Sequence, residues 1–197
     1  MLERVKEILH AEAEAIQSIP ISPEIERAIT TIMSCKGKLF TTGIGKAGYV
    51  ARKAASTFCT TGTPSVFVHP GDARHGDVGV ITPHDILLAY SNSGKTREVL
   101  EIVEFTKHLG VHAIIAVCAS KASPLGELCD IVLEIGDIKE PCPLGLTPSA
   151  STSAMTALSD AIALVIMGEL KFTAADFAAR HHGGYLGGKS RGDGAVN

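Results

Sequence analysis

Two stretches with helical spacing open the chain. Apolar residues between positions 2 and 16 recur every three or four residues, and after Pro20 and Pro23 the same period returns over about 24–33. This spacing places apolar side chains on one face of a helix. We therefore predict that residues 1–36 form N-terminal helices that pack on the main domain.

After Gly37 the pattern changes to short apolar runs that end at turn-forming residues. Such runs are typical of buried strands. Helical spacing returns between them, from Ala47 to about Cys59 and from Thr96 to about Leu109. Strands that alternate with helices form a parallel sheet with right-handed crossovers. The predicted fold class is therefore α/β, a three-layer sandwich with a five-stranded parallel sheet. The strand candidates are Lys38–Thr42, Ser65–His69, Ile86–Ser91, Ala113–Cys118 and Ile131–Ile135.

A third apolar stretch, from about Ser151 to Leu170, is nearly free of charge and predicts a buried helix. We expect the main domain to cover 37–187, with 188–197 as a flexible tail.

Composition excludes several classes of protein. Of 197 residues, 45% are hydrophobic and 20% charged, which indicates a globular chain rather than a disordered one. The net charge is −3 without a basic stripe, so nucleic acid is not an expected partner. No export leader and no continuous apolar run of about eighteen residues is apparent, and we expect a cytoplasmic protein with no membrane association. The five cysteines lack metal-site spacing and are expected to be reduced.

The segment Gly43–Gly48 follows a predicted strand and opens a helix. It formally matches the dinucleotide fingerprint, which makes a dehydrogenase the rival interpretation. That fingerprint expects an acidic residue about twenty positions further on, and 63–68 contains none. The segment instead presents Lys46 beside a helix N-terminus, where an anionic substrate is favoured.

A second candidate anion site is Ser91–Thr96, at the end of the third strand. Its hydroxyls, the N–H groups of the next helical turn and the helix dipole can converge on a phosphate. Glu98 follows in that turn, and Glu140 lies in a loop between Lys139 and two nearby prolines. A carboxylate held at a strand end suits proton abstraction, although a capping or solvated role is the plainer alternative for both.

Histidines gather in two places. His69 and His75 flank a Pro-Gly turn, and His181 and His182 precede a Gly pair. Imidazoles can transfer protons near neutral pH. No metal or other cofactor is expected to be required, because no carboxylate or Cys completes a site, but His69 and His75 are candidate contacts for an inhibitory metal.

These segments together resemble the sugar isomerase (SIS) superfamily, whose phosphate loop Ser-x-Ser-Gly-x-Thr/Ser-x-Glu corresponds to Ser91–Glu98. More narrowly the chain resembles the arabinose-5-phosphate isomerases, over roughly 37–187. The resemblance implies a flavodoxin- or Rossmann-like fold. The motifs that carry it are GIGKAG (43–48), FVHPGDARHGD (67–77), SNSG (91–94), EPCPLGLTPSAST (140–152) and FTAADF (172–177) with HHGG (181–184).

The resemblance implies an aldose–ketose isomerase that interconverts D-ribulose 5-phosphate and D-arabinose 5-phosphate through a cis-enediol, for synthesis of the sugar acid Kdo in lipopolysaccharide or capsule. A non-catalytic SIS regulator, or an isomerase of hexulose 6-phosphate or sedoheptulose 7-phosphate, is the alternative. The catalytic residues carried over are Lys46, Glu98, Glu140 and His181, with His75 as a further candidate. The substrate contacts are Gly62, Thr63, His69, His75, Ser91, Asn92, Ser93 and Thr96.

Three further expectations follow from the resemblance. The protein is expected to form a homotetramer in which His181 reaches a neighbouring subunit's site. It departs from the family pattern at Lys95 and His182, and it lacks the paired cystathionine-β-synthase modules of many relatives, so we expect no regulation through them. Kdo or its activated form CMP-Kdo could then act as a feedback ligand in the anion-binding cleft.

Overall fold

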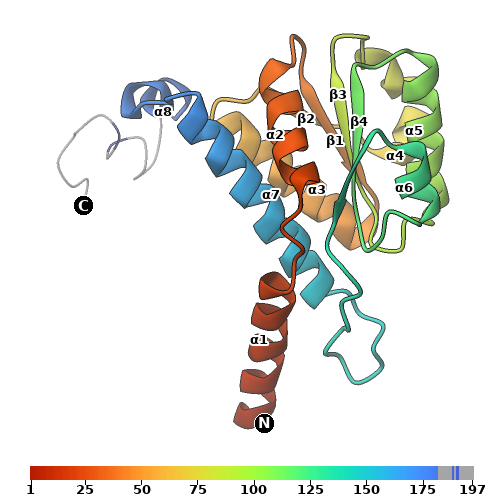
Figure 1. Cartoon of the computed structure of the whole chain (residues 1–197), viewed down its shortest axis with the longest axis vertical. Coiled ribbons are helices and arrows are strands. Elements are labelled where there is room, and N and C mark those ends of the chain that lie inside the picture. The colour runs from red at the N-terminus through yellow and green to blue at the C-terminus, as the bar shows by residue number, and fades with distance from the viewer. Residues whose placement is uncertain (182–187, 189, 191–197) are drawn as a thin grey trace.

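A five-stranded parallel sheet forms the centre of the protein (Figure 1). The structure is a computed structural model that describes residues 1–181, Gly188 and Ser190. The strand order is β2-β1-β3-β4-β5, and each neighbouring pair is parallel, which confirms the predicted fold class. The strands are β1 (Leu39–Gly43), β2 (Ser65–Phe67), β3 (Ile86–Tyr90), β4 (Ala113–Cys118) and β5 (Ile131–Glu134).

The long helices lie where the apolar spacing predicts them. They are α1 (Leu2–Gln17), α2 (Pro23–Ser34), α3 (Gly45–Thr60), α5 (Arg97–His108) and α7 (Ala150–Glu169). Four short helical elements have no counterpart in the predicted pattern, because they contain too few residues to display a period. They are α4 (Pro70–Ala73), the 3-10 helix η1 (Asp77–Val80), α6 (Pro124–Leu128) and α8 (Ala174–Arg180).

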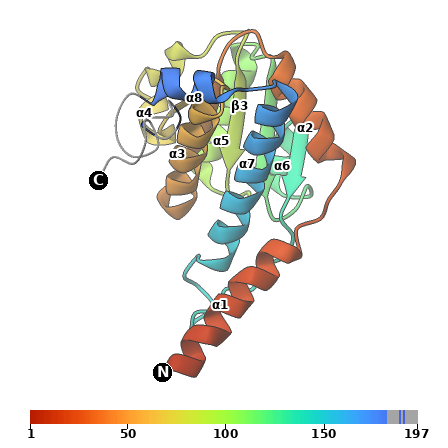
Figure 2. The ribbon, with the colours of Figure 1, turned by 90° about the vertical axis from the view of Figure 1, so that its left-hand side faces the viewer.

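Each face of the sheet supports its own core. On β3, Ile86, Leu88 and Tyr90 belong to a cluster with α2, α3 and α7, whereas Leu87 and Ala89 belong to a cluster with α4 and α5. This alternation follows from the two-residue period of a strand. The sheet is therefore the middle of three layers, with α2, α3 and α7 on one side and α4, α5 and α6 on the other (Figures 1 and 2).

The predicted buried helix is α7. Among the helices of the described residues, it alone has the length and mean hydropathy (1.5) to span a membrane, and 50% of that window is buried inside the protein. Inside the core, Ser159 of α7 lies with its hydroxyl 2.8 Å from the Tyr90 hydroxyl. Because a core helix meets the same criteria, α7 is weak support for a membrane span.

The cysteines are all free, and they are less uniformly buried than core thiols would be. Cys118 is buried, whereas Cys59 is exposed. Burial raises the pKa of the Cys118 thiol and raises that of Cys129 to about 12. These two thiols are therefore protonated and unreactive near neutral pH.

The carboxylate of Asp85 organises the amino end of β3. It accepts hydrogen bonds from the backbone N–H groups of Lys38 (2.6 Å) and Thr82 (2.7 Å) and from the Thr82 hydroxyl (2.8 Å). Burial opposes ionisation, but these bonds outweigh it and lower the pKa of Asp85. Gly37 is required beside it, because a Cβ there would lie 2.1 Å from the Asp85 carboxylate. These hydrogen bonds align β1 with β3 at the amino ends of the two strands.

Candidate active site

The strand order places a topological switch point between β1 and β3. The chain leaves β1 toward β2 on one side and leaves β3 toward β4 on the other. Gly43 and Tyr90, the last residues of the two strands, lie in register. Ligands of open α/β sheets bind beyond the carboxyl ends of strands at such a point. The loops after Gly43 and Tyr90 are thus the first place to seek a ligand site.

The turn from β1 into α3 is built by closely packed glycines. A Cβ on Gly48 would lie 2.7 Å from the carbonyl oxygen of Gly43, so any larger residue would push the helix from the strand. Gly45 has a φ of 59°, in the left-handed region that favours glycine. No side chain caps the N-terminus of α3, and Lys46 in its first turn is exposed. The turn therefore presents free N–H groups and one cation at the carboxyl edge.

The segment Ser91–Thr96 forms the neighbouring loop. The hydroxyls of Ser91 and Thr96 lie 2.9 Å apart, and the Ser93 hydroxyl accepts a hydrogen bond from the Lys95 N–H (3.2 Å). Thr96 is the N-cap residue, but no side chain caps α5, because the Thr96 hydroxyl is paired with Ser91 instead. The first N–H groups of α5 thus lack intrahelical partners and face the loop, as an anion site requires.

Two further polar groups belong to this loop. The Asn92 side-chain oxygen is buried and has no hydrogen-bond partner among the described residues, while the Asn92 carbonyl accepts from the Ala119 N–H (2.9 Å). Glu98 is half-buried in the first turn of α5. Asn92 is therefore part of the candidate anion loop, and Glu98 belongs to the helical turn that follows it.

Gly94 is the point at which this loop meets the loop after β4. Its φ is 62°, and a Cβ would lie 2.2 Å from the hydroxyl of Ser123. The Gly94 carbonyl accepts from the Leu125 N–H at 3.0 Å, and the Ser123 hydroxyl accepts from the Gly126 N–H and so caps α6. The conformation of the candidate phosphate loop thus depends on a neighbouring strand connection as well as on its own sequence.

His69 follows β2 and lies half-buried at the same edge. It lines a hollow of about 270 Å³ with Gly43, Gly45 and Gly48. The Arg52 guanidinium lies 3.9 Å from the centroid of the Phe67 ring, whose own centroid is 6.3 Å from that of His69. Arg52 and Phe67 are thereby part of this hollow, although the sequence pattern did not single them out.

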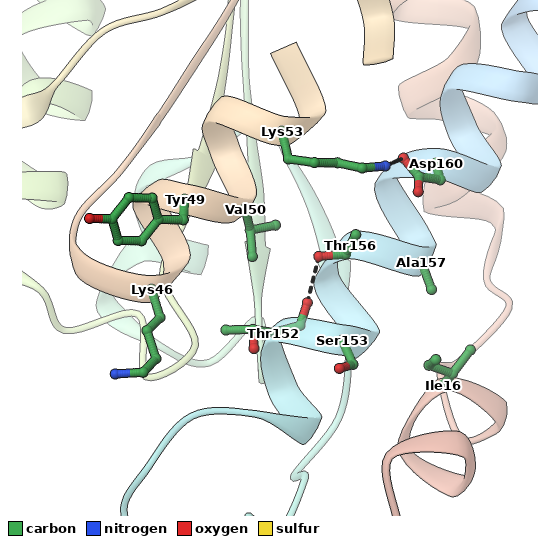
Figure 3. Close-up of a pocket in the computed structure, with 10 residues that line it drawn as sticks. All are labelled: Ile16, Lys46, Tyr49, Val50, Lys53, Thr152, Ser153, Thr156, Ala157 and Asp160. Carbon is green, nitrogen blue, oxygen red and sulfur yellow. Dashed lines mark hydrogen bonds and ion pairs between the residues drawn. The ribbon is translucent and has the colours of Figure 1, made fainter. Parts of the chain in front are cut away.

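Lys46 also lines a wider groove between α1, α3 and α7, with a volume of about 610 Å³. Figure 3 shows Lys46 at the end of this groove opposite the Lys53–Asp160 ion pair. Tyr49 lines both this groove and the hollow at His69. The two depressions are therefore adjacent, with Lys46 and His69 on their rims.

Glu140 is held at the N-terminus of α7. Its carboxylate accepts from the N–H groups of Ser149 (2.8 Å), Ala150 (2.9 Å) and Ser151 (3.3 Å), and from the Ser151 hydroxyl. Each oxygen thus accepts two hydrogen bonds. A carboxylate placed here also interacts favourably with the helix dipole. These bonds fix the position of the Glu140 carboxylate. For Glu140 to abstract a proton, one of the donors would have to move away, most simply the rotatable Ser151 hydroxyl.

Cys142 organises the rest of this loop. Its sulfur accepts from the N–H groups of Leu146 and Thr147, each at 3.2 Å. The bonds from Thr147 and Leu146 lower the pKa of the Cys142 thiol to about 7. Thiol and thiolate are therefore both populated near neutral pH.

The His75 side chain is exposed in the segment after α4, and the backbone N–H of His75 donates to the Asp72 carbonyl at 2.8 Å. Asp72 also lies 3.7 Å from the Nδ1 atom of His69. Within the described residues, no group of three or more His, Cys, Asp or Glu is arranged to hold a metal ion.

The remaining predicted residues lie at the opposite edge of the sheet. Gly62 and Thr63 follow the C-terminus of α3, and His181 follows α8, which lies beyond the far end of α7 (Figures 1 and 2). His181 stacks on Phe177 with ring centroids 4.1 Å apart and lines a hollow of about 450 Å³ with Gly62. α7 has 20 residues and is about 30 Å long, so His181 is remote from Glu140 within one chain. His182 and most of the predicted tail lie outside the described residues.

With this geometry established, comparison with known proteins identifies the family. The model of the SIS domain matches residues 32–165. The chain belongs to the SIS-domain family. It is 42% identical to arabinose 5-phosphate isomerase KdsD of Yersinia pestis over 186 residues, which cover 93% of this chain and 56% of that protein. It therefore spans little more than half the length of that relative.

Two solved structures are matched over nearly their whole length. A protein from Bacteroides fragilis, described as a putative phosphosugar isomerase involved in capsule formation, is 42% identical with a TM-score of 0.90, covering 94% of this chain and 99% of its own. An Escherichia coli CFT073 protein in complex with arabinose 5-phosphate is 39% identical with a TM-score of 0.88, covering 91% of this chain and 96% of its own.

We predict that Gly94→Ala disables the candidate phosphate loop. Alanine would need a left-handed conformation, at roughly 1–2 kcal/mol, and its Cβ would collide with Ser123. Calorimetric titration with a pentose 5-phosphate should show at least tenfold weaker binding. Gly168→Ala is the matched control, because its Cβ would enter open space on α7 and should leave binding unchanged. Unaltered affinity of a folded Gly94→Ala protein would contradict the assignment of this loop.

Proposed function

We propose that this protein is an aldose–ketose isomerase that interconverts D-ribulose 5-phosphate and D-arabinose 5-phosphate. The observation that carries the proposal is that Lys46 and the Ser91–Thr96 loop each stand at an uncapped helix N-terminus, after the two strands that flank the switch point. The chain that places them there is 39% identical to a protein solved with arabinose 5-phosphate. The names of the KdsD relatives support the same substrate.

The first requirement is to hold a phosphate dianion. The hydroxyls of Ser91, Ser93 and Thr96 and the first N–H groups of α5 supply donors on one side of the loop. Lys95, a departure from the family pattern, adds a cation beside them. With the phosphate anchored here, the pentose would extend toward Lys46 and the hollow at His69.

The second requirement is to move a proton between C1 and C2. A proton beside a carbonyl is weakly acidic, so the site needs a base, a donor to the enediolate oxygen and an acid–base partner for the hydroxyl. We assign Glu140 as the base, Lys46 as the donor, and Glu98 as an orienting group. His75 or His181 would open the ring of arabinose 5-phosphate and protonate the oxygen. Of these residues, only His181 lies away from the carboxyl edge of the sheet.

The position of His181 supports a shared site. His181, Gly62 and Thr63 gather at one edge while Lys46 and Ser91 lie at the other, so these groups could serve one substrate only if they come from different subunits. Exposed apolar side chains on α1 and α7, including Leu2, Leu9 and Leu164, offer contact surfaces. We therefore propose a homotetramer in which His181 enters a neighbour's site.

The same proposal includes a place for the product. Arabinose 5-phosphate would supply Kdo synthesis for lipopolysaccharide or capsule, in the cytoplasm. Kdo and CMP-Kdo carry a carboxylate that could bind the donors of Lys46, His69, His75 and the phosphate loop, which makes them candidate feedback ligands.

The activity test is incubation of the full chain with ribulose 5-phosphate, without added cofactor, and identification of the sugar phosphates formed. We expect arabinose 5-phosphate, with exchange of label between solvent and the substrate carbon. In Glu140→Gln, kcat should fall by roughly two to four orders of magnitude with a smaller change in KM.

Glu140→Gln also removes acceptors from the α7 cap, so stability must be measured in parallel. Ser151→Ala is the control, because it deletes one cap hydrogen bond and retains the carboxylate. If Glu140→Gln loses stability but keeps its turnover, Glu140 only caps α7 and is not the base. Conversion of only a hexulose or heptulose phosphate would reassign the substrate.

The shared site predicts complementation between inactive variants. Lys46→Ala and His181→Ala should each be inactive alone, whereas their co-expressed mixture should regain about a quarter of the wild-type activity, because random pairing leaves that share of sites with both groups. No recovery in mixed oligomers, or an active monomer in sedimentation, would refute the shared site.

Feedback binding predicts a thermal shift. CMP-Kdo at millimolar concentration should raise the unfolding temperature and inhibit in competition with substrate, because a ligand of the native state stabilises it by mass action. Gly94→Ala should lose both effects. A shift with arabinose 5-phosphate but none with Kdo or CMP-Kdo would end this part of the proposal.

A further inference from the structure

The segment that carries His69 and His75 has little local structure to hold it in place. α4 is only four residues long, with His69 before it and Arg74 after it. A single helical turn is unstable without tertiary contacts, because nucleation costs more than one turn of hydrogen bonds returns. Beyond it, Gly76 has a φ of 118° and most residues of 74–80 are exposed. The position of His75 must therefore be set by contacts outside this segment.

One such contact is an ion pair with α5. The Arg74 Nε atom lies 3.1 Å from Glu101 Oε2. The contact is an ion pair more than a directed hydrogen bond, because Glu101 Oε2 has no hydrogen-bond partner among the described residues. Pro70 and Ala73 are buried on the same side, and Ala73 shares a core cluster with Val99 and Ile102 of α5. The segment is thus attached to α5 at its apolar turn and at Arg74.

Glu101 has a second cationic partner on its own helix. The Arg97 Nε atom donates to Glu101 Oε1 at 2.9 Å. The Glu101 side chain is 18% exposed, that of Arg74 46% and that of Arg97 81%. The pair with Arg74 is therefore better shielded from solvent than the pair with Arg97, and of these two pairs only the one with Arg74 joins α5 to another segment.

We propose that Glu101 and Arg74 are positioning residues for the isomerase reaction. They connect the helix whose N-terminus holds the phosphate loop to the segment that presents His75, and so set the distance between the bound phosphate and the imidazole. A small displacement between a substrate anchor and a proton-transfer group lowers the population of reactive geometry. Neither residue lines the hollow at His69 or the groove at Lys46. This inference rests on the proposed isomerase function.

Two arginines on one carboxylate provide a matched test. Arg74→Ala should lower kcat for ribulose 5-phosphate roughly five- to tenfold with KM nearly unchanged, because the phosphate loop stays intact. Arg74→Lys should recover much of the rate through its charge. Arg97→Ala removes an equal charge from the same Glu101 without touching the segment 70–80. Its backbone N–H stays at the start of α5, so the lost cation beside the phosphate loop should affect KM alone and leave kcat at saturating substrate unchanged.

Hydrogen exchange reports the attachment without reference to activity. In Arg74→Ala, the amides of 75–80 should exchange up to about fivefold faster, while those of α5 keep their wild-type rates. In the amides of 75–80, Glu101→Gln should match Arg74→Ala, and the double variant should exchange no faster than either single one, since both remove the Arg74–Glu101 pair. Glu101→Gln also removes the pair with Arg97, whose effect is confined to α5.

The outcomes separate this inference from the proposed function. An inactive wild-type protein would refute the isomerase assignment, and unchanged exchange in Arg74→Ala would refute the attachment. An active wild-type protein with equal kcat in Arg74→Ala and Arg97→Ala would refute the positioning role. Faster exchange together with a selective loss of kcat in Arg74→Ala would support it.

Discussion

The parallel pairing of β1 with β3 is the interaction on which the candidate site depends. It joins two strands that are separated in sequence by α3, β2 and α4, and it aligns Gly43 with Tyr90. Two helices with uncapped N-termini, α3 and α5, consequently begin at the same edge of the sheet, one on each face. The dipoles and free N–H groups of both helices therefore favour an anion at the switch point, independently of any charged side chain.

Glycine makes this convergence sterically feasible. Gly48 allows α3 to approach the end of β1, and Gly94 allows the phosphate loop to lie against Ser123. On the other side of β3, Glu140 accepts the donors at the start of α7, and its loop follows β5. Hydrogen bonds between loops, rather than regular structure, therefore determine how the polar groups are oriented around the switch point.

The separation of functional groups between the two edges constrains the assembly. α3 and α7 each run from one edge of the sheet to the other. Lys46 lies in the first turn of α3, and Gly62 follows its C-terminus. Glu140 lies at the N-terminus of α7, and α8 with His181 follows its C-terminus. A protein that needs all of these groups for one substrate would have to place two chains together. In that arrangement, catalysis would depend on subunit association as well as on folding.

Much of the fold could be predicted from the sequence. The five strands follow from short apolar runs that end at turn-forming residues, and α1, α2, α3 and α5 follow from an apolar period over about a dozen residues. α7 was expected to be a buried helix because it carries almost no charge. The anion-binding loops were identified because glycine and hydroxyl residues follow predicted strands. The short elements α4, α6 and α8 could not be predicted, because they are stabilised by tertiary contacts rather than by a local pattern.

The roles of individual polar groups were decided only by the tertiary structure. The sequence placed Glu140 in a loop with nearby prolines and in one motif with residues 149–151, but nothing in that motif indicates that these residues donate all four of its hydrogen bonds. No sequence pattern indicated that Arg74 pairs with Glu101, or that Arg52 covers Phe67. The physical reason is range: hydrophobic periodicity is a local property that the chain records, whereas a hydrogen bond or ion pair between distant residues exists only after the sheet has brought their elements together.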